Sequence, residues 1–241
     1  THFKVLALCL LGTATMSPAS TIDPLYTGPR PFSDGGSFTG QRIAPGITSA
    51  VLAEGLRTRA DIGAIRAAVP GLLRQDPTDA MARVLMAIVT ALRSETEVAL
   101  SILGDGSTRF PETEHAIALS LIARAEGDFQ RAVEEADRAI SLDPAHPYAH
   151  HARATAIYAA EGALEAITSF ETAARLGRDG AVYWANFGAV LAETGALDPA
   201  ERALSRAVAI DPTACVVLNG RAQLNMLRAQ PAIAAENYSA C

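Results

Sequence analysis

Apolar residues recur at helical spacing over most of the chain, and this recurrence has a longer period of its own. The motifs SLDP, LGRD and AIDP place Pro144, Arg178 and Pro212 at intervals of 34 residues. Three series of small or aliphatic positions keep the same interval: Ala132, Ala166, Ala200 and Ala234; Ala139, Ala173, Ala207 and Cys241; and Leu142, Leu176 and Ile210. A fixed interval of this length is typical of a stack of repeated structural units.

Each repeated unit holds two helix-forming runs that are separated by a short turn, such as AEGD, AEGA or TGAL. Gly127, Gly162 and Gly195 lie in or beside these turns, where a reversal of the chain favours glycine. Pro144 and Pro212 cannot continue a helix, so they end the second run of their units. Long β-branched runs with period-two alternation are absent from the sequence, and we therefore predict an all-α fold.

The repeated unit resembles the tetratricopeptide repeat, with its pattern Trp-x2-Leu-Gly-x2-Tyr followed by Ala-x3-Phe-x2-Ala-x4-Pro. Residues 181–214 match this pattern throughout, through Trp184, Phe187, Gly188, Leu191, Ala200, Leu204, Ala207 and Pro212. Residues 113–146 and 147–180 match it in part, and residues 215–241 begin a truncated fourth unit. Residues 46–112 resemble it only weakly, as two degenerate hairpins over 46–79 and 80–112. The resemblance implies a right-handed α-solenoid of antiparallel helix pairs.

Some positions depart from the family pattern. Arg153 and Arg221 replace its large apolar residue, His150 stands in place of Trp, and Asn225 in place of Tyr. We expect these units to pack less tightly than residues 181–214, or to give the departing side chains polar partners.

The N-terminal region has a different composition. Residues 1–20 are typical of a secretory signal peptide, with Lys4, an apolar run from Val5 to Leu11 and a small-residue exit at 17–19. That run is too short to span a bilayer, which needs about 20 apolar residues. Residues 21–45 form a Pro/Gly-rich linker. This predicts a periplasmic or secreted protein, or a cytoplasmic one if residues 1–20 are instead a helix packed into a core.

The composition limits the kinds of partner. The chain is 49% hydrophobic and only 5% aromatic, which indicates a core of Ala, Leu, Ile and Val. Its net charge of −6 comes without clustered Lys and Arg, so we predict no nucleic-acid partner.

Cys215 and Cys241 fall at neighbouring ends of the last predicted hairpin, where either a disulfide or a buried small residue fits. The chain stops inside a predicted second helix, so we expect a fragment of a longer protein.

The sequence contains no catalytic pattern. His146 and His150 are four residues apart, but no carboxylate or Cys completes a metal site. His115, His150 and His151 lack a Ser or Cys partner in a nucleophile context. Residues 104–107, GDGS, lack the Lys-Ser/Thr of a phosphate-binding loop. We therefore predict no enzymatic activity, no metal and no cofactor.

The resemblance implies that the chain binds a protein or peptide on a concave face that is lined by the first helix of each unit. The partner-binding residues at the matching positions are Tyr148, His151, Thr155, Tyr158, Asn186, Glu193, Asn219, Gln223 and Met226, beside Val182, Ala185 and Ala189. This face lacks the Lys and Arg with which family members clamp acidic tails. The alternative for each of these residues is a tolerated solvent-facing position.

We therefore predict a non-enzymatic interaction scaffold in a cell-envelope or secretion assembly. An alternative is the substrate-recruiting arm of a larger enzyme, such as a glycosyltransferase or protease, with its catalytic domain beyond residue 241. A third hypothesis is self-association through the repeats, which predicts a mass in solution that depends on concentration. The sequence does not define the oligomeric state.

Overall fold

The computed structural model describes residues 46–104 and 108–241, and these residues form twelve α-helices and no strand. The helices are α2 (Ser49–Arg59), α3 (Ile62–Gln75), α4 (Ala80–Ala91), α5 (Thr96–Leu103), α6 (Glu112–Glu126), α7 (Phe129–Leu142), α8 (Pro147–Ala160), α9 (Ala163–Leu176), α10 (Ala181–Glu193), α11 (Leu197–Ile210), α12 (Cys215–Leu227) and α13 (Pro231–Ala240). The all-α prediction is confirmed. The signal peptide expected at 1–20, the linker expected at 21–45 and most of the GDGS segment lie outside the described residues.

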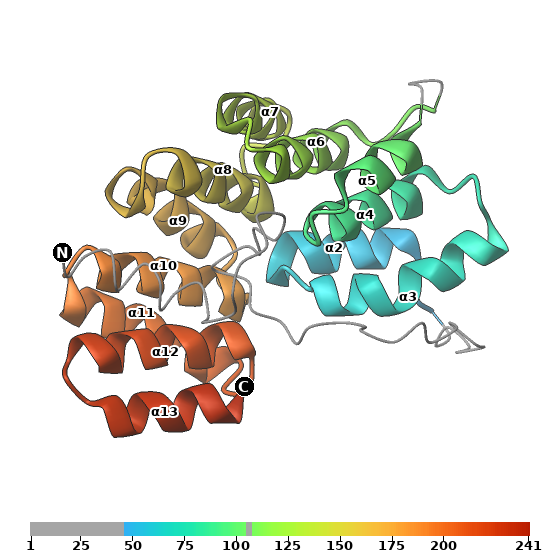
Figure 1. Cartoon of the computed structure of the whole chain (residues 1–241). Coiled ribbons are helices and arrows are strands. Elements are labelled where there is room, and N and C mark those ends of the chain that lie inside the picture. The colour runs from blue at the N-terminus through green and yellow to red at the C-terminus, as the bar shows by residue number, and fades with distance from the viewer. Residues whose placement is uncertain (1–45, 105–107) are drawn as a thin grey trace.

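Consecutive helices pack as antiparallel pairs, and the pairs stack into a right-handed solenoid (Figure 1). First helices of successive pairs contact each other, as α4 contacts α6, α6 contacts α8 and α10 contacts α12. The second helix of one pair also contacts the first helix of the next, as α9 contacts α10. This stacking is what the repeat requires, because a single pair cannot bury both of its faces. The expected fold class, a solenoid of tetratricopeptide-repeat type, is therefore the observed one.

Glycine lies at some of the turns within the pairs, whereas the turns after α2, α4 and α12 place Ala60, Ser94 and Ala229 at positive φ angles. Gly127 and Gly195 adopt positive φ angles of 82° and 84°, at the turns that follow α6 and α10. A Cβ atom added at either position would meet nothing within 4 Å, so the backbone angle rather than crowding selects glycine there.

Small residues hold the helices close together at the repeated positions. Ala132, Ala166, Ala200 and Ala234 are each 0% exposed, as the 34-residue series predicts for helix contacts. Leu204 of α11 lies between α10 and α12, where a Cβ atom on Gly188 or on Gly220 would come within 2.6 Å of its side chain. The missing side chains at these positions let three helices converge on Leu204.

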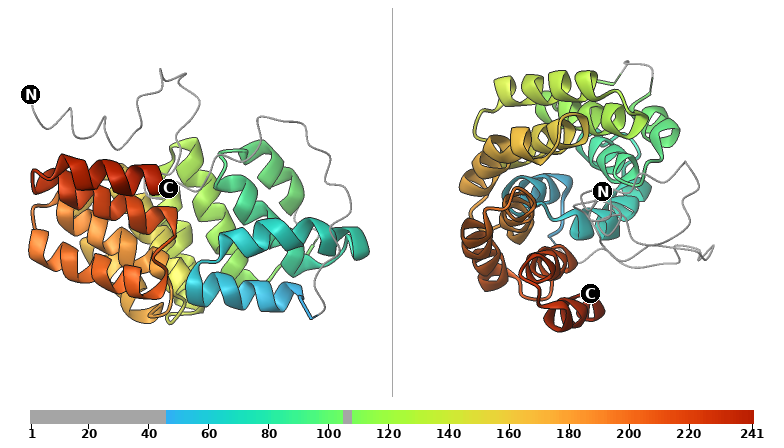
Figure 2. Two further views of the ribbon diagram at one scale, coloured as in Figure 1. Left: turned by 90° about the horizontal axis from the view of Figure 1, so that it is seen from below. Right: turned by 60° about the vertical axis from the view of Figure 1, so that its left-hand side comes forward.

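The solenoid curves so that its N-terminal pair returns to its inner side. α2 contacts α8 and α10, which follow it by about a hundred residues in the chain (Figure 2). The buried hydroxyl of Tyr183 on α10 donates to the carbonyl oxygens of Leu56 and Arg57 at 3.0 and 3.1 Å. Arg57 also pairs with Asp143, with Nε and Oδ2 3.4 Å apart. We refer to this set of interactions as the α2 contact.

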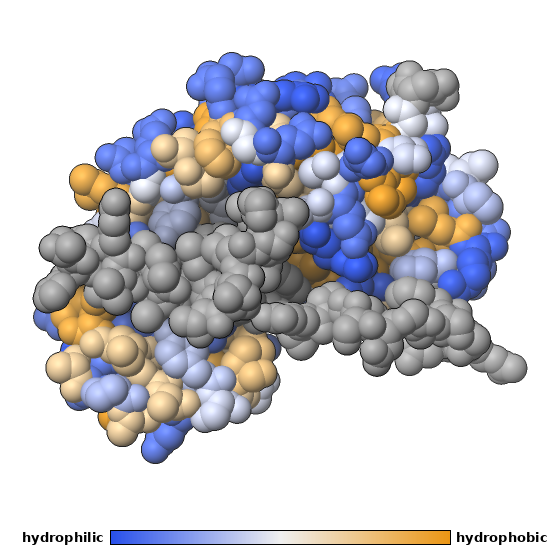
Figure 3. All heavy atoms as spheres, viewed as in Figure 1, coloured by the Kyte–Doolittle hydropathy of each residue, from blue (hydrophilic) through white to orange (hydrophobic). Residues whose placement is uncertain are grey.

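The outer side over α6 and α7 is mainly hydrophilic, whereas the α12–α13 pair presents more apolar residues (Figure 3). Ile233 and Tyr238 of α13 are 42% and 46% exposed. Within residues 46–104 and 108–241, no helix combines the length and the apolar character that a membrane crossing needs.

Candidate functional site

The nine residues predicted for the concave face lie on the first helices of three successive pairs, namely α8, α10 and α12. They divide into two groups by exposure. The buried group is Tyr148, His151, Thr155, Asn186 and Gln223, each at most 9% exposed. The accessible group is Tyr158, Glu193, Asn219 and Met226, which are half-buried or exposed.

The buried group forms internal contacts of the solenoid. Asn186 Nδ2 and His151 Nε2 lie 2.7 Å apart and join α10 to α8. The His151 ring packs against Tyr148, Phe170 and Tyr183, with ring centroids 5.4 to 5.9 Å apart. Side chains held in this way stabilise the stack, so they cannot meet a partner without a change in the fold.

The α2–α3 junction explains much of this burial. Ala60 and Ile62 lie against the face that His151 and Asn186 form. The space that remains between them measures about 10 Å³, which is room for about one water molecule. The protein's own N-terminal pair therefore occupies the part of the concave face where we expected a ligand. Val182 is half-buried at the same place, and Ala185 and Ala189 are buried.

The accessible residues lie toward the C-terminal ends of the first helices, apart from Asn219 near the start of α12. The Tyr158 hydroxyl donates to Glu193 Oε2 at 2.8 Å and so links the ends of α8 and α10. Met226, at the end of α12, is 49% exposed. We refer to Tyr158, Glu193 and Met226 as the exposed edge. A tyrosine, a carboxylate and a methionine combine hydrogen-bonding groups with adaptable apolar area.

His146, His150 and His115 take part in helix capping, hydrogen bonding and ring stacking. His146 caps the N-terminus of α8, where its Nδ1 accepts from Ala149 N at 3.4 Å. Burial lowers the pKa of His146 to about 4, against the opposing effect of the Asp143 carboxylate. His150 Nε2 lies 3.0 Å from Pro144 O, and His115 stacks on Phe110. Over the described ranges, no three His, Cys, Asp or Glu side chains gather as a metal site would need.

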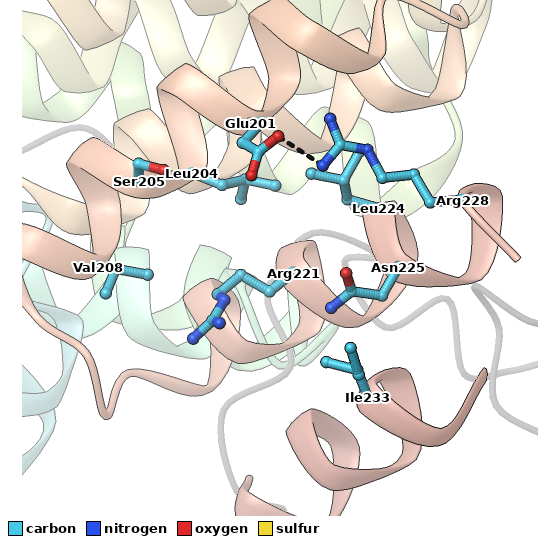
Figure 4. A pocket seen from close by; sticks show the side chains of 9 residues that line it. All are labelled: Glu201, Leu204, Ser205, Val208, Arg221, Leu224, Asn225, Arg228 and Ile233. Atoms are coloured by element: carbon cyan, nitrogen blue, oxygen red, sulfur yellow. Dashed lines mark ion pairs between the residues drawn. The ribbon is translucent and has the colours of Figure 1, made fainter. Parts of the chain in front are cut away.

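Sequence reasoning did not predict a groove between α11, α12 and α13, with a volume of about 340 Å³ (Figure 4). Leu204 and Ser205 line it from α11, and Arg221 and Asn225 line it from α12. Arg228 lies at one end and forms ion pairs with Glu201 and Asp198. Two of these residues, Arg221 and Asn225, are departures from the repeat pattern, so a sequence signal for the groove did exist.

Cys215 and Cys241 form a disulfide that joins the start of α12 to the end of α13, with Cα atoms 4.9 Å apart. Cys241 is exposed, although the repeat pattern favours a buried small residue at its position. Of the two alternatives that the sequence left open, the structure has the disulfide.

The chain resembles a chain of the APC/C heterotetramer Cut9–Hcn1, with a TM-score of 0.64 and 17% sequence identity. The match covers 79% of this chain but only 36% of that chain, so this protein spans about a third of its neighbour. A MamA RS-1 double mutant matches with a TM-score of 0.50 and 20% identity, over 67% of this chain and 91% of that one. YrrB, a TPR protein with an unusual peptide-binding site, matches with a TM-score of 0.46 and 17% identity, over 72% and 90%.

No family model and no curated protein matches the sequence. Likeness at these identities bears on the fold alone. Together with the helix pairs and their 34-residue interval, it defines a tetratricopeptide-repeat solenoid.

Proposed function

We propose that this protein is a non-enzymatic scaffold that binds a protein or peptide partner through the exposed edge of its concave side. The observation that carries the proposal is the position of Tyr158, Glu193 and Met226 on three successive first helices, beyond the part that the α2–α3 junction covers. Solenoids present such rows of residues as extended binding surfaces. Asn219, which is half-buried, extends this surface along α12.

We also infer that the protein is exported to the periplasm or secreted and acts in a cell-envelope or secretion assembly. The signal-like residues 1–20 support export. The Cys215–Cys241 disulfide supports it independently, because such crosslinks persist in oxidising compartments. Cell fractionation tests this inference, and recovery of the full-length chain with reduced thiols in the cytoplasm would contradict it.

Site-specific crosslinking tests the exposed edge. A photoreactive amino acid replaces Glu193 in one variant and Met226 in another, and it replaces Glu134 in a matched control, because Glu134 is exposed on the outer helix α7. We expect the same partner protein to be captured from positions 193 and 226, and not from position 134. Capture from position 134 alone would place the partner on the outer side.

Substitutions then measure the contribution of the edge. Tyr158→Ala combined with Glu193→Lys should weaken binding of the captured partner by about tenfold or more, because interface energy concentrates in a few such residues. Asn186 is unsuitable for this test, since its side chain holds α10 to α8. Unchanged affinity in a variant with unchanged helical circular dichroism would contradict the proposed surface.

A further inference from the structure

The groove between α11, α12 and α13 exists because charged residues occupy positions that are apolar one repeat earlier. Glu201 and Arg221 line the groove. The residues 34 positions before them are Ile167 and Phe187, which pack against one hydrophobic cluster between α9 and α10. At that junction the apolar side chains fill the space between helices. Between α11 and α12 the corresponding space is open to solvent.

Arg221 also differs from the arginine at its own repeat position. Arg153, which precedes it by two repeats, binds Asp137 Oδ1 and Ser169 Oγ at 2.7 Å each. The residues equivalent to Asp137 and Ser169 beside Arg221 are Ser205 and Asn237. Ser205 carries no charge, and Asn237 Nδ2 donates to a backbone carbonyl, that of Ile233, at 2.8 Å. The carboxylate that neutralises the earlier arginine is therefore missing here.

The charge of Arg221 has no counterion within the part of the chain that the structure describes. Glu201, the acidic residue that lines the groove, is paired with Arg228. Figure 4 shows Arg228 and Glu201 joined at one side of the groove, while the guanidinium group of Arg221 extends toward the side of Val208. The half-buried Arg221 side chain thus supplies an uncompensated positive charge beside an apolar floor that includes Leu204 and Leu224.

We propose that this groove binds an extended segment of a partner protein in which a carboxylate side chain lies next to an aliphatic one. The planar guanidinium of Arg221 matches a carboxylate with two parallel hydrogen bonds. Leu204, Leu224 and Ile233 bury the aliphatic side chain. Ser205 and Asn225 offer a hydroxyl and an amide to the peptide backbone. The volume of about 340 Å³ suits a few side chains rather than a folded domain.

This second binding site is separate from the exposed edge, because its residues lie on α11 and α13 and on a different side of α12. It does not depend on the proposed use of the concave side. It supplies a positive charge, which the concave face does not.

The test selects a displayed library of random short peptides on the full chain, and then measures synthetic versions of the enriched peptides by fluorescence anisotropy. We expect the enriched peptides to carry Asp or Glu next to Leu, Ile or Val. Arg221→Gln should weaken their binding by about 10- to 100-fold, the range for loss of a charge-assisted hydrogen bond. Changing the peptide carboxylate to its amide should cause a similar loss in the wild type and little further loss in Arg221→Gln.

Two variants control for effects on folding. Arg153→Gln alters the arginine at the same repeat position, which has its own partners, and it should leave binding unchanged. Arg221→Phe restores the residue type of position 187, so it should abolish binding while it raises the thermal midpoint by filling the groove. A folded Arg221→Phe variant that still binds would contradict the assignment.

The other outcomes also decide the question. Enriched peptides without an acidic residue, or no enrichment at all, would overturn the groove as a binding site. Loss of binding in Glu193→Lys but not in Arg221→Gln would place the peptide on the exposed edge and leave only the scaffold proposal standing. Enrichment of sequences that match residues 21–45 would make the occupant the protein's own segment rather than a separate partner.

Discussion

The buried histidine at the start of α8 makes the stability of the protein depend on pH. His146 is 2% exposed, and the pKa of its imidazole is lowered from 6.5 to about 4, mainly because burial disfavours the charged form. Asp143 opposes this shift, while Arg57 and His150 add to it. In the unfolded chain the same imidazole takes up a proton near pH 6.5.

The sign of the effect follows from this difference. Between about pH 6.5 and about pH 4 the unfolded chain binds a proton at His146 that the folded chain does not bind. Lowering the pH through this window therefore stabilises the unfolded state relative to the folded one. A shift of about 2.5 units at 1.36 kcal/mol per unit amounts to about 3 kcal/mol of lost stability by pH 4.

The comparison variant is His146→Asn. Asparagine also caps helices well, so it keeps the interaction with Ala149 N but cannot titrate in this range. Urea denaturation, followed by circular dichroism, gives the free energy of unfolding of both proteins from about pH 7 to about pH 4. The advantage of the wild type over the variant should shrink by about 3 kcal/mol across the window. A constant difference, or an NMR titration of His146 in the folded protein centred near 6.5, would refute this reasoning.

Two other features make measurable contributions. Tyr183→Phe removes only the hydroxyl that donates to α2. We expect the free energy of unfolding to fall by about 1 kcal/mol and amide hydrogen exchange in α2 to become faster. Unchanged exchange in α2 would show that this hydroxyl does not hold the helix in place. Cys215→Ser removes the crosslink between α12 and α13 and should lower the stability of this pair by about 3 kcal/mol. Alkylation of both Cys215 and Cys241 in the wild type without reductant would contradict the disulfide.

The helices and their stacking were predictable because they depend on short-range pattern. The small residues of the 34-residue series, such as Ala132 and Ala200, are buried where the period places them. The glycines at the turns after α6 and α10, Gly127 and Gly195, are selected by their own backbone angles. These constraints act within one repeat or between neighbours, so a sequence displays them directly.

The burial of residues on the concave face could not be predicted from the repeat pattern. His151 and Asn186 occupy positions that face a ligand in the resembling family, but here they lie under the α2–α3 junction. That junction reaches them through contacts across more than a hundred residues, for which the repeat pattern carries no signal. The two arginines that replace the pattern's large apolar residue did indicate where the packing changes. Arg153 has polar partners, and Arg221 marks an incompletely filled junction, so both expected consequences occur, at different repeats.

The α2 contact also determines how this solenoid can change. An open repeat array tolerates the gain or loss of a unit, because each unit contacts only its neighbours. Here Tyr183 of α10 must meet the end of α2, so the number of units between them is fixed by geometry. Insertion or deletion of one unit within this stretch would rotate α10 away from α2 and break the closure. Units beyond α10 carry no such constraint, so they can be gained, lost or altered without breaking the contact between α10 and α2.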